Sequence, residues 1–331
     1  MTRTLRVATR GSALARAQTG HVVAALIEAT GVEVETIVIN SEGDRSKESL
    51  SSLGGTGVFA SALREALLAG ECDLVVHSLK DLPTAPYEGL VIAAVPERED
   101  PRDALCSRDG LTLDELPEGA RVGTGSPRRV AQLLSLRPDL EIVDIRGNVD
   151  TRLGRVREGD LDAVVLAAAG LTRLGRLDAA AELFALDIWP SAPGQGALAI
   201  ETREGDSIPE LLSIEHPPTR TAVLAERSVL AALEAGCAAP VGAAATVLGD
   251  ELQLFATVYQ ADGEAELGCE RTAELLGDDR HVAELLGAAV ATQLLEDGAA
   301  ELAPVGGAAA VAAAAAEAEG DEPGYRPGGT E

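Results

Sequence analysis

The chain has 331 residues, of which 46% are hydrophobic and only 2% aromatic, and its formal net charge at pH 7 is −27. This length suffices for two or three domains with cores of Ala, Val and Leu. The charge disfavours nucleic acid and anionic membranes as partners through long-range repulsion, and the lack of aromatics disfavours base stacking. An acidic surface that is almost free of lysine suggests a protein working in concentrated salt, although a GC-rich genome produces part of the same bias.

The four cysteines lie far apart and form neither a disulfide framework nor a metal-binding pattern. They are Cys72, Cys106, Cys237 and Cys269. We expect reduced thiols and no metal site. The chain begins with a strand-like LRVAT rather than a signal peptide, and no apolar run of about 20 residues indicates a membrane span, so we expect a cytoplasmic protein, as a monomer.

Short apolar runs alternate with helical patterns in the first half of the chain. Strands are predicted at 5–8, 34–39, 74–76, 90–95, around Val122, and at 142–145 and 163–167, and helices at 13–29, 59–69 and 128–136. This alternation predicts an α/β fold with largely parallel sheets. From about Pro217 the pattern becomes α+β, with helices at 219–233 and 279–295 around strands at 243–248, 251–260 and 264–271. After about Ala303 follows a low-complexity acidic tail, which we expect to be disordered.

An internal repeat is visible within the α/β part. RVATRGSALARAQ at 6–18 resembles RVGTGSPRRVAQ at 121–132, and DLVVHSLKDL at 73–82 resembles DAVVLAAAGL at 162–171. Two matches in the same order indicate two related α/β domains that face one another, with a ligand in the cleft between them. A chance match of two short segments is the weaker alternative.

Arginine is concentrated in one segment of this acidic chain. Between Arg121 and Arg157 lie eight arginines and four acidic residues, a local balance of +4. Guanidinium groups match carboxylate or phosphate, so the segment indicates a site for a polyanionic small molecule. Arg146 follows a predicted strand and Arg152 comes soon after it, at the edge where open α/β sheets bind ligands. The alternative is a solvated face with local ion pairs to Asp150 and Glu158, which is plausible for Arg155 and Arg157. We assign Arg121, Arg137 and Arg157 to the fold or the surface, and Arg155 stays undecided.

Two serines stand where a predicted strand gives way to a helix. They are Ser12 and Ser126. The free N–H groups of a helix N-terminus bind anions, whereas ordinary N-capping is the commoner role of such a serine. Arg10 beside Ser12, and Arg128 and Arg129 just after Ser126, favour anion binding at both positions.

Lys80 and Asp81 follow a buried strand in VVHSLKDLP. An isolated surface ion pair is the commoner reading of such neighbours, but the position at a strand's carboxyl end favours a catalytic carboxylate. His77 is expected to pack beneath the loop. Cys237 lies in the turn LEAGCAAPVG, where a cysteine is exposed enough to react, whereas Cys72 and Cys269 fall in strand patterns and Cys106 also looks structural.

Nine collinear motifs between about residues 5 and 300 resemble the hydroxymethylbilane synthase family, also called porphobilinogen deaminases. They are TRGSALA, GGTGVF, VHSLKDLP, EREDPRDA, VGTGSPRR, RGNVDTRL, AGLTRLG, APGQGALAIE and EAGCAAPVG. The resemblance implies two α/β domains shaped like periplasmic binding proteins and a smaller α+β C-terminal domain. Their expected bounds are 1–98 with 195–216, 99–194, and 217–303, followed by the tail at 304–331.

The resemblance also implies a transferase activity. The family joins four porphobilinogen molecules, each bearing an acetate and a propionate, into the linear tetrapyrrole hydroxymethylbilane with loss of ammonia. Asp81 would be catalytic, and a dipyrromethane cofactor would be attached to Cys237 by a thioether. Cofactor contacts are implied for Lys80, Asp81, Thr124, Ser126, Arg128 and Arg129. Substrate contacts are implied for Arg10, Ser12, Gln18, Arg146, Asn148, Arg152, Arg173 and Gln195.

Two positions depart from the family pattern. Thr56 stands in the GGTGVF motif where many members have lysine, and Gly125 stands where a second serine is common. A different class of function also fits two α/β lobes with anion sites, namely a binding protein that captures a small carboxylate or oxyanion without chemistry. The third region with Cys237 disfavours that class. A nucleic-acid-binding regulator is disfavoured by the net charge and by the lack of a helix-turn-helix pattern.

Overall fold

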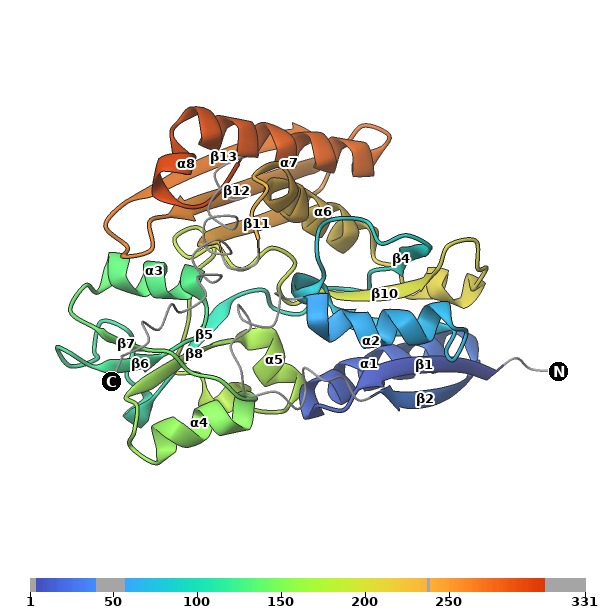
Figure 1. The fold of residues 1–331 in the computed structure, drawn as a ribbon, viewed down its shortest axis with the longest axis horizontal. Helices are drawn as coiled ribbons and strands as arrows, with labels where there is room; N and C mark the ends of the chain where they lie inside the picture. Colours follow the sequence, from blue (N-terminus) through green and yellow to red (C-terminus); the bar gives the residue numbers. More distant parts are fainter. Residues whose placement is uncertain (1–3, 40–56, 237–238, 307–331) are drawn as a thin grey trace, which may run out of the picture.

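The computed structural model describes residues 4–39, 57–236 and 239–306, which form three sheets with helices packed against them (Figure 1). The first sheet has the strand order β2-β1-β3-β10-β4. Its strands are β1 (Thr4–Arg10), β2 (Glu33–Ile39), β3 (Leu74–Ser78), β4 (Leu90–Ala94) and β10 (Leu198–Arg203). The helices of this unit are α1 (Ala13–Thr30) and α2 (Gly57–Leu68), with 3-10 turns η2 (Leu79–Asp81) and η5 (Pro209–Ser213). Strand β10 comes from far along the chain and lies between β3 and β4.

The second sheet has the order β7-β6-β8-β5-β9. Its strands are β5 (Asp103–Ser107), β6 (Arg121–Gly123), β7 (Glu141–Val143), β8 (Ala163–Ala167) and β9 (Glu182–Leu183). Helices α3 (Pro127–Leu136), α4 (Val149–Arg157) and α5 (Ala168–Arg173) belong to this unit, with 3-10 turns η3 (Arg108–Gly110) and η4 (Leu177–Ala179). A mainly aliphatic core that includes Leu105, Leu133 and Trp189 is shared between its sheet and helices.

The two sheets repeat one topology. Strands β1 and β6, which carry the first repeated motif, each run parallel to two neighbours, and β3 and β8, which carry the second, occupy the same place in their sheets. A shared contact marks the repeat: Asp73 Oδ2 accepts from the backbone N–H of Arg6 at 2.9 Å, and Asp162 Oδ2 accepts from that of Arg121 at 2.8 Å. The prediction of two related α/β domains is therefore confirmed.

The prediction of largely parallel sheets is wrong. Four strand pairings in these two sheets are parallel and four are antiparallel. All the antiparallel pairings involve β5 or β10, which the sequence analysis did not predict. Each of these strands enters its sheet directly from the other lobe, without the helical crossover that parallel neighbours need. The chain thus passes between the lobes twice, once before β5 and once before β10.

The third unit is α+β, as predicted. Strands β11 (Val241–Leu248), β12 (Glu251–Tyr259) and β13 (Glu266–Glu274) form an antiparallel sheet, with helices α6 (Pro217–Ala232), α7 (Asp279–Glu296) and α8 (Ala299–Leu302). Its core is rich in alanine and valine, so the helices approach closely. In the part of the chain that the structure describes, no helix is both long and apolar enough to cross a membrane.

Gly287 marks the closest approach of α7 to α6. A Cβ added there would lie 2.5 Å from the carbonyl oxygen of Ala225 and 2.5 Å from the Cβ of Ser228, distances that real Cβ atoms do not show. We expect Gly287→Ala to lower the free energy of unfolding by about 1–3 kcal/mol, because the gain in helix propensity is smaller than the cost of separating the helices. Urea unfolding measures the effect.

Gly20→Ala is the matched control. Gly20 also lies inside a helix, α1, but no described heavy atom comes within 4 Å of a Cβ added there. This change is expected to be neutral or to stabilise by about 0.5–1 kcal/mol. Equal effects of the two substitutions would contradict the assignment of Gly287 as a packing contact.

Candidate active site

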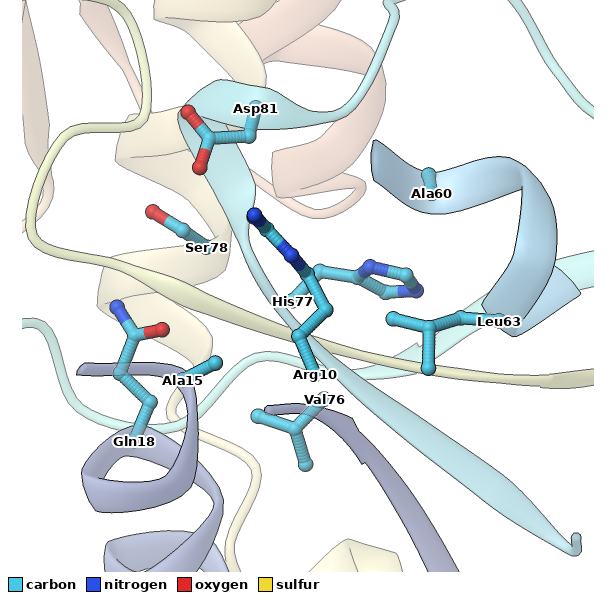
Figure 2. A pocket seen from close by; sticks show the side chains of 9 residues that line it. All are labelled: Arg10, Ala15, Gln18, Ala60, Leu63, Val76, His77, Ser78 and Asp81. Atoms are coloured by element: carbon cyan, nitrogen blue, oxygen red, sulfur yellow. The ribbon is translucent and has the colours of Figure 1, made fainter. Parts of the chain in front are cut away.

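A pocket opens at the carboxyl ends of β1 and β3, with an empty volume of about 360 Å³ that includes the solvent at its mouth (Figure 2). Arg10 ends β1, Ser78 ends β3, and Asp81 follows in the turn η2. Figure 2 shows the guanidinium of Arg10 pointing toward the carboxylate of Asp81, with Gln18 on one side. The other lining residues are Ala15, Ala60, Leu63, Val76 and His77. The lining of the pocket therefore combines the Asp81 carboxylate and the Arg10 guanidinium with several apolar side chains.

The turn that carries Asp81 is fixed by its apolar residues. Leu79 and Leu82 are buried on either side of it, and the backbone N–H of Leu79 donates to Ala197 O at 3.0 Å. Lys80 and Asp81 remain half-buried. The Lys80 ammonium donates to Gln195 Oε1 at 3.1 Å. Burial, and after it the nearby charge of Arg129, lower the pKa of Lys80 to about 8.

His77 is buried, as expected, and lines the inner side of the pocket. Its Nε2 lies 3.2 Å from Glu201 Oε2 on β10. The Arg64 guanidinium makes an ion pair with the same carboxylate, at 2.8 Å from Nη2 to Oε1. Two basic groups thus converge on Glu201, and the sequence analysis identified neither Arg64 nor Glu201.

Arg128 and Arg129 are buried in the first turn of α3, where both bind Asp103. Arg128 Nη1 lies 2.9 Å from Asp103 Oδ2, and Arg129 Nη2 lies 2.6 Å from Oδ1. The indole N–H of Trp189 also donates to this carboxylate, at 2.9 Å. Burial by itself would raise the pKa of Asp103, but the two arginines outweigh it and hold the pKa well below its usual range. Sequence reasoning missed Asp103, although the motif EREDPRDA contains it.

Gln195 connects Asp103 to Lys80. Its Nε2 donates to Asp103 Oδ1 at 2.8 Å and to Pro101 O at 2.8 Å, while its Oε1 accepts from Lys80. Lys80 belongs to the first lobe and Asp103 begins the second. One chain of hydrogen bonds therefore runs from Lys80, the neighbour of Asp81, through Gln195 and Asp103 to the arginines of α3.

The helix N-termini of the repeat differ in what their serines do. The Ser12 hydroxyl accepts from Ala15 N at 3.2 Å, which is ordinary capping of α1. Ser126 occupies the N-cap of α3, but within the described residues its side chain makes no capping hydrogen bond. The hydroxyl of Thr124, buried beneath it, accepts from Ser126 N at 3.2 Å. Of these two helix N-termini, that of α3 therefore has the serine hydroxyl that does not cap its helix.

The predicted substrate residues of the second lobe occupy different settings. Arg146 is exposed, with Nε 4.0 Å from Asp144 Oδ2, and Asn148 caps α4 by accepting from Thr151 N at 2.9 Å. Arg152 is half-buried and donates to Gly147 O at 2.9 Å, and burial lowers its pKa.

Arg173, on α5, reaches across to the other lobe. Its Nη2 donates to Gly196 O at 2.7 Å, just before β10, and burial lowers the pKa of the guanidinium. Arg173 thus touches the same crossing segment that carries Gln195. None of the contacts of Arg146, Arg152 or Arg173 in the described residues includes an ion pair shorter than 4.0 Å.

Two of the arginines that we assign to the fold or the surface pair with nearby acidic residues. Arg121 pairs with Glu141 at 3.2 Å, and Arg137 pairs with Asp139 at 2.7 Å. The undecided Arg155 pairs with Asp160 at 2.6 Å. Of the two suggested partners, Asp150 is wrong, because it binds Arg176 at 3.1 Å.

The cysteines are placed only in part. Cys237, and with it the predicted cofactor anchor, lies outside the described residues, as does Thr56. Cys106 is buried in β5, and Cys269 is half-buried in β13. Cys72 is buried as expected, but it precedes β3 rather than belonging to a strand. No group of three or more His, Cys, Asp or Glu side chains in the described part of the chain could hold a metal ion.

Comparison with known proteins identifies the family. A model described as "Porphobilinogen deaminase, dipyromethane cofactor binding domain" matches residues 5–210, and one described as "Porphobilinogen deaminase, C-terminal domain" matches residues 220–296. The porphobilinogen deaminase of Leifsonia xyli subsp. xyli is 60% identical over 315 residues, covering 92% of this chain and 95% of that protein. That of Thermobifida fusca is 56% identical over 300 residues, covering 89% and 94%. Among solved structures, the methionine-binding protein MetQ is 14% identical with a TM-score of 0.42, covering 64% of this chain and 88% of that one. On the two matching models and the two similar porphobilinogen deaminases, the chain belongs to the porphobilinogen deaminase family.

Proposed function

We propose that this protein is a transferase that joins four porphobilinogen molecules head to tail, with release of ammonia, into the linear tetrapyrrole hydroxymethylbilane. The observation that carries the proposal is the pocket in which Asp81 faces Arg10 at the carboxyl ends of β1 and β3. A carboxylate next to cationic groups suits a substrate that brings its own carboxylates and develops positive charge during reaction.

The described residues fit a dipyrromethane cofactor, which would be held covalently by Cys237 and would supply the primer for chain growth. Its carboxylates require donors, and Arg129 Nε is buried with no hydrogen-bond partner among the described residues. The Lys80 ammonium and the uncapped N-terminus of α3 at Ser126 are further donors for an anion. An orphaned buried donor costs free energy unless a ligand satisfies it, so Arg129 favours a bound carboxylate.

Asp81 is proposed to perform the chemistry. Its carboxylate would accept a hydrogen bond from the pyrrole N–H of porphobilinogen and stabilise the positive charge that develops as ammonia leaves. The same carboxylate would stabilise the attacking pyrrole until that ring loses its α proton. Arg10, which points at Asp81, would keep the carboxylate in place and offer donors to a substrate carboxylate.

Recognition of the substrate's acid groups is proposed for residues of both lobes. Gln18 and Ser12 lie on α1 and at its N-cap, whereas Arg146, Arg152, Arg173 and Asn148 lie in the second lobe. A charge-assisted hydrogen bond is worth roughly 1.5–3 kcal/mol, so several of them together would retain a growing chain. Gln195 would act mainly through Lys80, which it already binds.

The domain bounds, the location and the salt requirement of the protein are proposed as well. We infer domain bounds of 1–98 with 195–216, 99–194 and 217–303, supported by the place of β10 within the first sheet. We infer a cytoplasmic location, which the free thiols of Cys72, Cys106 and Cys269 support, and a monomeric state. Function in concentrated salt is supported by the net charge of −27.

The pairing of a carboxylate with the pyrrole N–H predicts the behaviour of Asp81 variants. Asp81→Asn is expected to fold and to bind cofactor but to lose at least about 100-fold in turnover, because the amide cannot balance the developing charge. Asp81→Glu should retain a small activity, since the charge is kept but displaced. Tetrapyrrole formation from porphobilinogen is measured by absorbance, and turnover of Asp81→Asn at the wild-type rate would rule out this role.

The cofactor anchor is tested by mass. Intact wild-type protein is expected to exceed its sequence mass by one dipyrromethane, whereas Cys237→Ala should show the sequence mass alone and no turnover. Cys269→Ala, which alters a half-buried thiol of the same domain, is the control and should keep the adduct. An adduct that persists in Cys237→Ala would move the anchor elsewhere.

The lowered pKa of Lys80 predicts a pH dependence. Lys80 is charged below its pKa of about 8 and neutral above it, so its attraction for a carboxylate is lost as the pH rises through that value. We expect kcat/KM for porphobilinogen to fall above about pH 8 in the wild type. Lys80→Arg stays charged and should shift this limb upward by at least one pH unit. If kcat/KM falls at the same pH in both proteins, another group is responsible for the pH dependence.

A further inference from the structure

The turn η2, which presents Asp81, is held from behind by a residue of the third domain. The Arg227 guanidinium on α6 donates to three backbone carbonyls of the Leu79–Pro83 stretch. Nη1 lies 3.3 Å from Leu79 O and 2.9 Å from Leu82 O, and Nη2 lies 2.7 Å from Pro83 O. These carbonyls bracket Asp81 on both sides. Arg227 thus fixes the backbone on either side of the carboxylate without being one of the residues that line the pocket.

The same face of α6 packs against the apolar side of the turn. Val223, one helical turn before Arg227, is 2% exposed and shares a buried cluster with Leu79 and Leu82. Residues four apart lie on one face of a helix, so a single face of α6 supplies both the apolar contact and the hydrogen-bond donors. The position of Asp81 therefore depends on α6 as well as on β3.

The neighbouring residue ties α6 to both segments that connect the two lobes. The Glu226 carboxylate is fully buried and accepts from Arg98 Nη1 at 2.7 Å and Nη2 at 2.9 Å, on the first crossing. It also accepts from Gly194 N at 2.7 Å, on the second crossing. A fourth hydrogen bond, from Ala245 N at 2.9 Å, comes from β11 of its own domain. Because α6 is anchored in this way, Arg227 is a fixed support rather than a free surface arginine.

We propose that Arg227 is a positioning residue for the reaction: from the third domain it holds the catalytic turn so that Asp81 meets the reacting pyrrole. This inference rests on the proposed function. Its physical basis is that three carbonyls would lose their guanidinium donors if Arg227 were removed, so the turn would relax toward other donors. A displacement of about 1 Å at a reacting group can cost about 100-fold in rate.

The test compares Arg227→Met with Arg227→Lys and with a control on the same helix. Arg220, seven residues earlier, also links α6 to the first lobe, through Ile92 O and Glu215, but does not touch the turn. For each full-length protein, cofactor loading is read from the intact mass, and kcat and KM for porphobilinogen are measured per loaded molecule. The melting temperature is recorded in parallel.

We expect Arg227→Met to load cofactor normally and to lose about 10- to 100-fold in kcat, with KM changed less than about threefold. Arg227→Lys keeps the charge and some donors, so its kcat should fall by only about threefold. Arg220→Gln should match the wild type. A kcat for Arg227→Met equal to that of the wild type, or an equal loss in Arg220→Gln, would overturn the proposal.

Two further outcomes are decided by the same measurements. If Arg227→Met does not fold, Arg227→Lys decides, because a single ammonium cannot serve all three carbonyls in the same geometry, and an unchanged kcat would overturn the proposal. If the wild type itself produces no tetrapyrrole from porphobilinogen, the proposed function fails. An active wild type with an unaffected Arg227→Met leaves that function standing and removes only the role of Arg227.

Discussion

The arrangement of charged groups where the two lobes meet depends on the buried carboxylate of Asp103. Two guanidinium groups, Arg128 and Arg129, lie in the interior beside it, and an uncompensated charge there would cost several kcal/mol. Asp103 neutralises one of these charges outright, and its hydrogen bonds to Trp189 and Gln195 use its remaining lone pairs. The second positive charge stays available to the site. Asp103 therefore sets both the position of the arginines and the net charge that a ligand meets.

The location of Asp103 makes this interaction a joint between lobes. It is the first residue of β5, the strand that follows the first crossing, and Gln195 lies just before β10, the strand that follows the second. The amide of Gln195 faces a carboxylate with its nitrogen and an ammonium with its oxygen, so its orientation is determined by charge. Lys80 is thereby tied to the second lobe although it belongs to the first.

Local pattern was enough to predict the repeated strands and the polar residues at their ends. Buried strands are followed by Lys80 and Asp81 in one case and end at Arg10 in the other. The fold places the carboxyl ends of these two parallel strands at one edge of the sheet. Long-range partners were not predictable in this way. Asp103 is separated from Arg129 by 26 positions and from Gln195 by 92, and nothing local marks it as their partner.

Strand direction and helix caps were missed for similar physical reasons. Strand β10 inserts between β3 and β4 from more than 100 residues away, so the antiparallel pairings depend on the path of the whole chain. The asparagine of RGNVDTRL was assigned to substrate by resemblance, yet Asn148 accepts from Thr151 N, and Ser12 likewise caps α1. A cap and an anion site share the same residue types, so only the hydrogen-bond partners distinguish them.

The partial neutralisation of Arg128 and Arg129 by Asp103 also helps to decide between a protein that only binds a carboxylate and an enzyme. A protein built only to capture a carboxylate gains most when its cations have no other counter-charge. Here Arg128 and Arg129 already share a carboxylate, so each acid group of a ligand gains less binding free energy from them. Tight binding of every intermediate would not raise the rate of the reaction. A chain that grows by one ring at a time must be retained and later released. Moderate attraction at α3, combined with a firmly held Asp81 in the first lobe, suits that requirement better than it suits storage of a small anion.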